Sequence, residues 1–177
     1  MIVFRHADAR YPFLWESGAQ PAARWHGPGD GPVAYLAETP DGAWAEFLRH
    51  EEIGDPADLA GVSRAIWAID LPDPPETRPR LRTAVMTGGL QTYPACRAEA
   101  ARIRRRSTGS GGLVAPSAAL LPRTPSGFRT DGGLRPGPQR RERTFVLFGP
   151  RPDLVGWCAC EAGRPRADLL PRVRHLG

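Results

Sequence analysis

Short hydrophobic runs separated by Pro, Gly and charged residues make up most of the chain, and this pattern predicts many short elements. Apolar or alternating runs of strand length predict strands over residues 2–5, 32–37, 64–71, 112–117 and 144–148. The strand over 64–71 should end at Pro72, because proline cannot donate a hydrogen bond to a neighbouring strand.

Two segments have helical character. Thr39 offers a hydroxyl N-cap, followed by a proline at the first helical position and an acid in the first turn, which predicts a helix over 40–51. Its buried stripe should carry Trp44, Phe47 and Leu48. The second helix, over 93–106, is rich in alanine and ends in arginines, whose charge suits the negative end of the helix dipole.

The remaining segments predict loops and a mixed fold. Residues 8–30 and 123–143 are rich in Pro and Gly, 107–112 should form a flexible turn, and the tail from Leu154 should hold a small apolar patch and a short last helix. Strands and helices alternate without a βαβ period, which predicts a loop-rich α+β fold. A length of 177 residues fits one domain, 1–177.

Charge narrows the class of partner. The formal net charge is +5, the pI is about 9.8, and all 24 basic residues are arginine. This excess of positive charge favours anionic partners such as phosphates, nucleotides or nucleic acid. Arginine can also bind two oxygens of one phosphate at once, which lysine cannot do. Neither a G-x-G-x-x-G turn after a strand nor a Walker loop is present, so the common nucleotide-binding folds lack support.

The sequence predicts no membrane span and no metal site. No run approaches the roughly 18 apolar residues of a spanning helix, and the charged N-terminus lacks a signal-peptide core, so we expect a cytoplasmic protein. The three cysteines are Cys96, Cys158 and Cys160. The Cys-x-Cys spacing is too tight for the usual zinc site and predicts a structural thiol pair near a strand end.

Four polar residues are candidates for chemistry: Arg24, Tyr35, Glu46 and Ser117. Arg24 lies in a loop just before a predicted strand, Tyr35 within that strand, and Glu46 in the middle of the following helix. A helical wheel places Glu46 at the shoulder of the apolar stripe, from which a carboxylate points either into a cleft or into solvent. Wheel geometry alone favours solvent for Glu46, and each of the other candidates taken singly also has an ordinary structural explanation.

The order of these residues resembles the RES family. Arg24-Trp25-His26, then residues 33–37, 43–46 and 114–118 follow the family pattern. The family is named for an Arg, a Glu and a Ser, which fall here on Arg24, Glu46 and Ser117, and Arg5 matches an arginine of the first strand. The family usually has Gly-Arg-Trp-Asn, so His26 departs from the pattern and puts any amide contact from that position in doubt.

The resemblance implies an ADP-ribosyltransferase-like fold that binds NAD as a substrate and breaks its nicotinamide–ribose bond without a metal. Known relatives are bacterial toxins of toxin–antitoxin pairs, and some transfer the ADP-ribosyl group to inorganic phosphate. For this chain the resemblance therefore implies phosphate, water, or a protein or nucleic-acid target as acceptor, and an antitoxin protein as partner. The choice of acceptor stays open at this point, because these acceptors differ only in the placement of one oxygen.

The resemblance also implies roles for the residues. Nicotinamide leaves NAD as a neutral base, so the enzyme needs to stabilise an oxocarbenium-like ribose, and one carboxylate, Glu46, can do this. Ser117 would hydrogen-bond the ribose or orient Glu46. Arg24 would bind the pyrophosphate or an incoming phosphate. Supporting roles in binding are implied for Arg5, and ring stacking on nicotinamide for Tyr35 and Trp25.

Two alternatives remain. A nucleic-acid-binding module would use the arginines of 102–106 and 140–143, although no helix-turn-helix, RNP-type strand or zinc finger accompanies them. A RES-like domain without activity would only bind a partner protein, and it would carry Arg24, Glu46 and Ser117 without bringing them to one pocket.

Overall fold

The short hydrophobic runs assemble into one antiparallel sheet of six strands, in the order β10-β3-β1-β2-β9-β4. The computed structural model describes residues 1–17, 19–106 and 111–176. The strands of this sheet are β1 Ile2–Ala7, β2 Val33–Ala37, β3 Arg64–Asp70, β4 Gly112–Pro116, β9 Arg143–Phe148 and β10 Val155–Gly163. The helices are α1 Pro40–His50, η1 Pro56–Gly61, α2 Thr83–Thr87, η2 Leu90–Thr92, α3 Tyr93–Arg106 and η3 Ala167–Arg172. The predicted α+β class is confirmed.

The sheet consists of two halves that meet at a narrow junction. β1 pairs with β3 from Ile2 to Ala7, whereas β1 pairs with β2 only where Phe4 lies opposite Ala37. The strands therefore diverge on both sides of that pair. Side chains from both halves share one hydrophobic cluster, which includes Val3, Leu36, Ile69, Phe145 and Leu147. The two halves thus pack on each other and leave an opening beside the junction.

Helix α1 packs across the junction, against β1 and β2. It begins as the sequence predicts, because the Thr39 hydroxyl accepts a hydrogen bond from the backbone N–H of Gly42 at 3.0 Å. The predicted stripe of Trp44, Phe47 and Leu48 is buried, in a cluster that also holds residues of η1 and η3. This burial holds the helix in place over the opening between the two halves.

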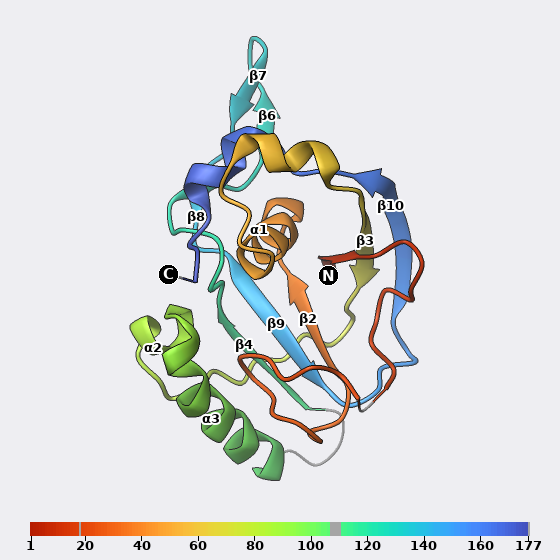
Figure 1. Ribbon diagram of the computed structural model, residues 1–177, viewed down its shortest axis with the longest axis vertical. Coiled ribbons are helices and arrows are strands. Elements are labelled where there is room, and N and C mark those ends of the chain that lie inside the picture. Colours follow the sequence, from red (N-terminus) through yellow and green to blue (C-terminus); the bar gives the residue numbers. More distant parts are fainter. Residues whose placement is uncertain (18, 107–110, 177) are drawn as a thin grey trace.

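Helix α3 covers β4 on the other half of the sheet. Its buried side chains, among them Cys96, Ala100 and Ile103, pack with Leu113 of β4 and Val146 of β9. In Figure 1, α3 and the edge strand β10 lie on opposite sides of the molecule. None of the helices in the described part of the chain combines the length and the apolar composition that a membrane span requires.

The prediction of a loop over 123–143 was wrong. This segment contains two short strand pairs, β5 Thr124–Pro125 with β8 Gln139–Arg140 and β6 Phe128–Thr130 with β7 Leu134–Pro136. The β6–β7 hairpin projects from the molecule (Figure 1) and its residues are exposed. A hairpin exposed on both faces has no buried side, so it shows no alternation of apolar and polar residues.

The prediction for the tail missed β10. The short last helix is present as η3, but the residues before it form a nine-residue edge strand. Its side chains are almost all exposed, and a bulge between Cys158 and Cys160 shifts the pairing with β3, so the strand lacks the period of two that would identify it. Of the turn expected over 107–112, residues 107–110 lie outside the described part of the chain.

Candidate functional site

A cavity of about 380 Å³ opens at the junction of β1 and β2. Phe4 and Ala37, the one pair that joins these strands, belong to its lining. The wall also includes residues of the segment 20–25, α1, the start of α3 and the turn after β4, together with Arg64 of β3 and Thr144 of β9. Its lining carries the titratable side chains of Arg5, His6, Arg24, Tyr35, Glu46, Arg49, His50, Glu51, Arg64 and Tyr93.

Glu46 points into this cavity from the middle of α1 and is half-buried. Its Oε1 accepts long hydrogen bonds from the hydroxyls of Ser117, at 3.4 Å, and Thr144, at 3.5 Å. Burial raises the pKa of the Glu46 carboxyl group, and the nearby charges of Arg49 and Arg24 act in the opposite direction. The preference of the helical wheel for solvent was wrong, because β9 and the turn after β4 pack over the shoulder of the helix.

Three arginines surround this carboxylate: Arg24, Arg49 and Arg174, which we call the inner arginines. Arg24 and Arg49 both donate to the carbonyl oxygen of Gly88, each at 2.7 Å, and Arg49 and Arg174 both donate to the carbonyl oxygen of Ala118. No salt bridge among the described residues involves any of the three. Carbonyl groups, and for Arg24 also the Thr92 hydroxyl, hold them in place, and their positive charge is available to an anion.

Arg49 is a site residue that sequence reasoning missed. It lies three residues after Glu46, so the helical period places both on neighbouring positions of one face, and this spacing was the available signal. Burial, together with repulsion by Arg24, lowers the pKa of Arg49. The same causes lower the pKa of Arg174, which no local pattern marks because it reaches the site from the end of the chain.

A chain of hydrogen bonds holds the segment that carries Arg24. The Tyr35 hydroxyl accepts from the backbone N–H of Trp25 at 3.0 Å and lies 2.9 Å from Nδ1 of His26. Nε2 of His26 lies 2.9 Å from the carbonyl oxygen of Pro21, which can only accept, so Nε2 carries the proton and Nδ1 accepts from Tyr35. His26, the residue at which the sequence departs from the family pattern, therefore holds the Tyr35 hydroxyl in place.

These bonds define what the two aromatic candidates can do. Burial raises the pKa of Tyr35, and its hydroxyl already donates one hydrogen bond and accepts another, so its ring is the part that offers the cavity a free surface. The Trp25 side chain is only 2% exposed and packs in the hydrophobic cluster under α3, so it has little free surface for stacking. Tyr93, which the sequence did not mark, lies in the lining under the guanidinium group of Arg24, at 4.6 Å.

Ser117 lies behind Glu46 and is buried. Its Oγ accepts hydrogen bonds from the backbone N–H groups of Ala119, at 3.2 Å, and Leu120, at 3.0 Å, and donates to Glu46. Its neighbours Pro116 and Ala118 belong to the cavity lining. Of the two roles implied for Ser117, this geometry favours orientation of Glu46. The structure thus brings Arg5, Arg24, Tyr35 and Glu46 to one cavity, with Ser117 in direct contact with Glu46.

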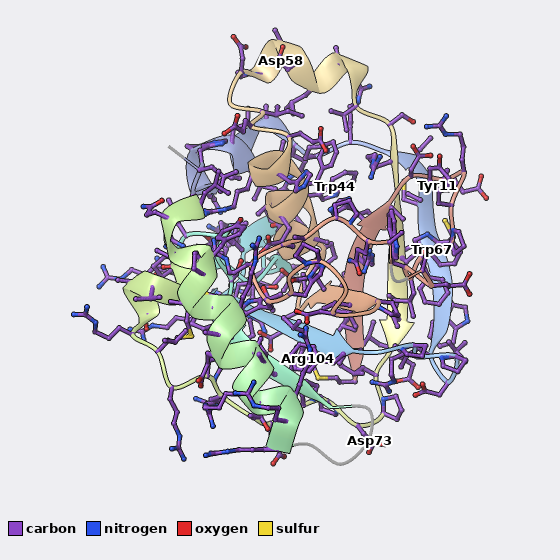
Figure 2. All side chains as sticks on the ribbon, turned by 60° about the horizontal axis from the view of Figure 1, so that its bottom comes forward. Tyr11, Trp44, Asp58, Trp67, Asp73 and Arg104 are labelled. Carbon is purple, nitrogen blue, oxygen red and sulfur yellow. The ribbon has the colours of Figure 1, made fainter. Side chains whose placement is uncertain are left out.

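The arginine cluster at the end of α3 is partly neutralised. Arg102 forms two bonds of 2.7 Å with Glu99. Arg104 reaches from α3 toward the loop before β2 (Figure 2), where it forms a 2.7 Å salt bridge with Asp30 and lies over the ring of Phe148. Arg102 is therefore neutralised within α3, and Arg104 attaches α3 to the loop before β2.

The cysteines do not form the expected thiol pair near a strand end. Cys158 and Cys160 are free, exposed and in the middle of β10, and Cys96 is buried under α3. Among the described residues, no group of three or more His, Cys, Asp or Glu side chains is arranged to hold a metal ion.

The chain matches a known protein family. The model of the RES domain matches residues 2–133, which is more than half of the chain, and this confirms the resemblance found in the sequence. The matched region carries Arg5, Arg24, Tyr35, Glu46 and Ser117. A search of curated proteins finds no match.

Proposed function

The chain belongs to the RES domain family, and we propose that it is an enzyme that binds NAD and breaks the nicotinamide–ribose bond, with inorganic phosphate or water as acceptor. The observation that supports this most directly is the arrangement around Glu46, whose carboxylate faces the cavity beside Arg24 and Arg49, neither of which forms a salt bridge with any described residue. Glu46 matches the charge that develops at the reacting bond of NAD, and the arginines match the charge of its pyrophosphate.

The carboxylate matches the charge that develops during cleavage. The C1′–N bond breaks with its electron pair on nicotinamide, which leaves neutral, while the ribose becomes positive. A carboxylate fixed beside C1′ in a site that excludes water stabilises that charge, and such preorganised groups typically contribute about 100-fold to 1,000-fold in rate. The long hydrogen bonds from Ser117 and Thr144 fix Glu46 without consuming its capacity to accept further bonds from ribose hydroxyls.

The inner arginines match the other end of the substrate. The pyrophosphate of NAD carries negative charge at two phosphates, and planar guanidinium groups bind such oxygens in pairs. Arg24 is the residue we assign to the pyrophosphate, with Arg49 beside it. The rings of Tyr35 and Tyr93 in the lining offer flat surfaces for nicotinamide or its ribose.

The proposal extends to the whole chain. We propose that residues 1–177 form a single, ADP-ribosyltransferase-like domain, because β9 lies between β2 and β4 and the sheet is incomplete without the segment beyond the family match. A role as a toxin that is paired with an antitoxin protein rests on the family resemblance alone.

The test follows nicotinamide release from NAD with and without inorganic phosphate. We expect release by the native protein and its loss in Glu46→Gln, which keeps the shape of the side chain and removes the charge. Glu161→Gln is the matched control, because Glu161 is exposed on the edge strand β10. Release that requires phosphate identifies a phosphorylase, and release without it a glycohydrolase. Folded protein that releases nothing in either condition would overturn the proposal in favour of a domain that only binds a partner.

A further inference from the structure

A second hollow lies at the C-terminal end of α3, which points toward the bottom of Figure 1. It has a volume of about 310 Å³ and is lined by Thr77, Arg78, Arg80, Arg102, Ile103 and Arg106. We call this hollow the arginine groove. None of its lining residues belongs to the cavity that holds Glu46. That cavity reaches the start of α3, so the length of the helix, about 20 Å, separates the two sites.

One wall of the arginine groove is the segment between β3 and α2. Four prolines in this segment favour an extended backbone. The carbonyl oxygen of Thr77 accepts a hydrogen bond from a backbone N–H of β4 at 2.9 Å, and the N–H of Arg80 donates to Oε1 of Glu99 in α3 at 2.5 Å. Pro79 is buried, whereas Arg78 and Arg80 on either side of it are exposed. The backbone is therefore fixed, and the two arginine side chains point away from the core.

The opposite wall is the last part of α3. Arg102 and Arg106 lie four residues apart, so they share one side of the helix with a separation of about 6 Å. Arg78 and Arg80 are two residues apart along an extended segment, which separates them by about 6–7 Å. Each wall therefore presents guanidinium groups at a spacing close to that of successive phosphates along one strand of a nucleic acid.

Most of the charge in the arginine groove has no partner within the protein. Arg102 forms two bonds of 2.7 Å with Glu99, which Arg80 also attracts from farther away. Among the described residues, no salt bridge involves Arg78, Arg80 or Arg106. Four guanidinium groups thus share one carboxylate, and three positive charges remain. Their mutual repulsion would be offset by a bound anion.

The hydrogen-bonding groups of the lining favour a phosphodiester chain over an acidic peptide. A guanidinium group can only donate, and the Thr77 hydroxyl is the one side-chain acceptor among the described lining residues. A phosphodiester backbone brings charged acceptors and no N–H donors, so the arginine groove can satisfy it. An acidic peptide would also bring backbone N–H groups, for which the lining offers almost no acceptors.

The absence of aromatic residues from the described lining indicates how the nucleic acid is held. Proteins that bind single strands usually stack the exposed bases on aromatic side chains. In a duplex the bases are already stacked on one another, and contacts to phosphates alone are sufficient for binding without sequence preference. The lining therefore suits the backbone of a duplex.

We propose that the arginine groove binds the sugar–phosphate backbone of a nucleic-acid duplex without reading its sequence. This site is separate from the site proposed for NAD, and the inference does not depend on NAD cleavage. Binding through phosphates alone releases counterions from the duplex, so its affinity falls steeply as the salt concentration rises.

The experiment measures fluorescence anisotropy of a short labelled DNA duplex over a range of salt concentrations. For the native protein, the logarithm of affinity should fall with the logarithm of salt concentration with a slope of about 3, one for each unpaired arginine. The double variant Arg78→Gln/Arg106→Gln removes one exposed arginine from each wall. It should bind about tenfold or more weakly at 0.1 M salt, and its slope should fall to about 1.

The matched control removes the same charge elsewhere. Arg129→Gln/Arg135→Gln changes two exposed arginines of the β6–β7 hairpin and should weaken DNA binding less than about threefold. Equal losses in the two double variants would show that only the overall charge matters and would overturn the proposal. An affinity that stays at the native value in Arg78→Gln/Arg106→Gln would also overturn it.

Two further measurements separate the alternatives. If poly-glutamate binds the native protein as tightly as the duplex does and loses affinity in Arg78→Gln/Arg106→Gln, the groove takes an acidic peptide and the nucleic-acid proposal is wrong. Nicotinamide release by this variant should stay within about twofold of the native rate, because the two sites share no lining residue. The outcome for the groove is therefore independent of the outcome for NAD cleavage.

Discussion

Two carboxyl groups are associated with helix α1, one within it and one at its start, and they differ in what surrounds them. Glu46, in the middle of the helix, faces the cavity. Glu142 precedes β9, and its Oε1 accepts hydrogen bonds from the backbone N–H of Thr39 at 2.7 Å and from its hydroxyl at 3.0 Å, so it holds the N-terminus of α1. Burial raises the pKa of both carboxyl groups, and that of Glu142 reaches about 7.

This comparison shows that burial and a raised pKa do not by themselves identify a catalytic group. The bonds to Glu142 are short and its surroundings are filled, since a Cβ atom on Gly42 would overlap its side chain. The bonds to Glu46 are long, and open space lies in front of it. Access to a cavity distinguishes a carboxylate available for chemistry from one that holds the fold together.

The strongest test of the comparison removes the charge of Glu46 and keeps the shape of its side chain. Glu46→Gln should lower the rate of nicotinamide release by about 100-fold to 1,000-fold, because it removes the charge that stabilises the ribose. The free energy of unfolding at pH 7 should stay the same or rise, since a buried charge is removed. An assay of nicotinamide release measures the rate, and urea denaturation of the same variant measures the free energy of unfolding. A large loss of stability would mean that Glu46, like Glu142, has a structural role.

Adding a methyl group at Gly42, next to the Glu142 side chain, should have the next largest effect. Gly42→Ala should destabilise the protein by about 2–3 kcal/mol, because the added methyl group overlaps the Glu142 carboxyl group and contacts Ala37 at 3.1 Å. Gly54→Ala is the control, as no heavy atom lies within 4 Å of its added Cβ. Chemical denaturation of both variants gives the difference, and equal midpoints would show that the surroundings of Glu142 are not filled.

Glu142 should also make stability depend on pH. Its pKa in the folded protein, about 7, lies above its ordinary value of 4.5, so its contribution is fully present below about pH 4.5 and is lost as the pH rises through about 7. Glu142→Gln should match the native protein near pH 4.5 and exceed it by about 2 kcal/mol at pH 8. Urea denaturation at both pH values measures this, and a difference independent of pH would contradict it.

The smallest effect is expected at Ser117, which contacts Glu46 from behind. Ser117→Ala should cost about 1 kcal/mol of stability, because Oγ accepts two backbone hydrogen bonds in the turn after β4. Nicotinamide release should fall less than about tenfold, because Thr144 still donates to Glu46. Thermal denaturation and steady-state kinetics provide the two values. A loss of activity as large as that in Glu46→Gln would show that Ser117 contacts the substrate directly.

The elements that could be predicted are those whose conformation is specified by residues close together in the sequence. Thr39 with the proline and acid after it marks the start of α1, and the apolar stripe marks its buried face. β9 was predicted because it is buried along almost its whole length. β10 and the β6–β7 hairpin were missed because their side chains are exposed, and an exposed strand owes its conformation to backbone pairing with β3 or within the hairpin.

The sequence by itself determined the α+β class, the predicted strands and helices, and the family to which Arg24, Glu46 and Ser117 point. The tertiary structure decided where these residues face. The cavity exists because β1 and β2 pair only at Phe4 and Ala37, and its charge comes from arginines that lie far apart along the chain. Side-chain periodicity describes only the neighbourhood of a residue in its own element. Which side chains meet across a junction between two half-sheets depends on long-range packing, so Arg49, Arg64 and Arg174 became site residues only in the folded protein.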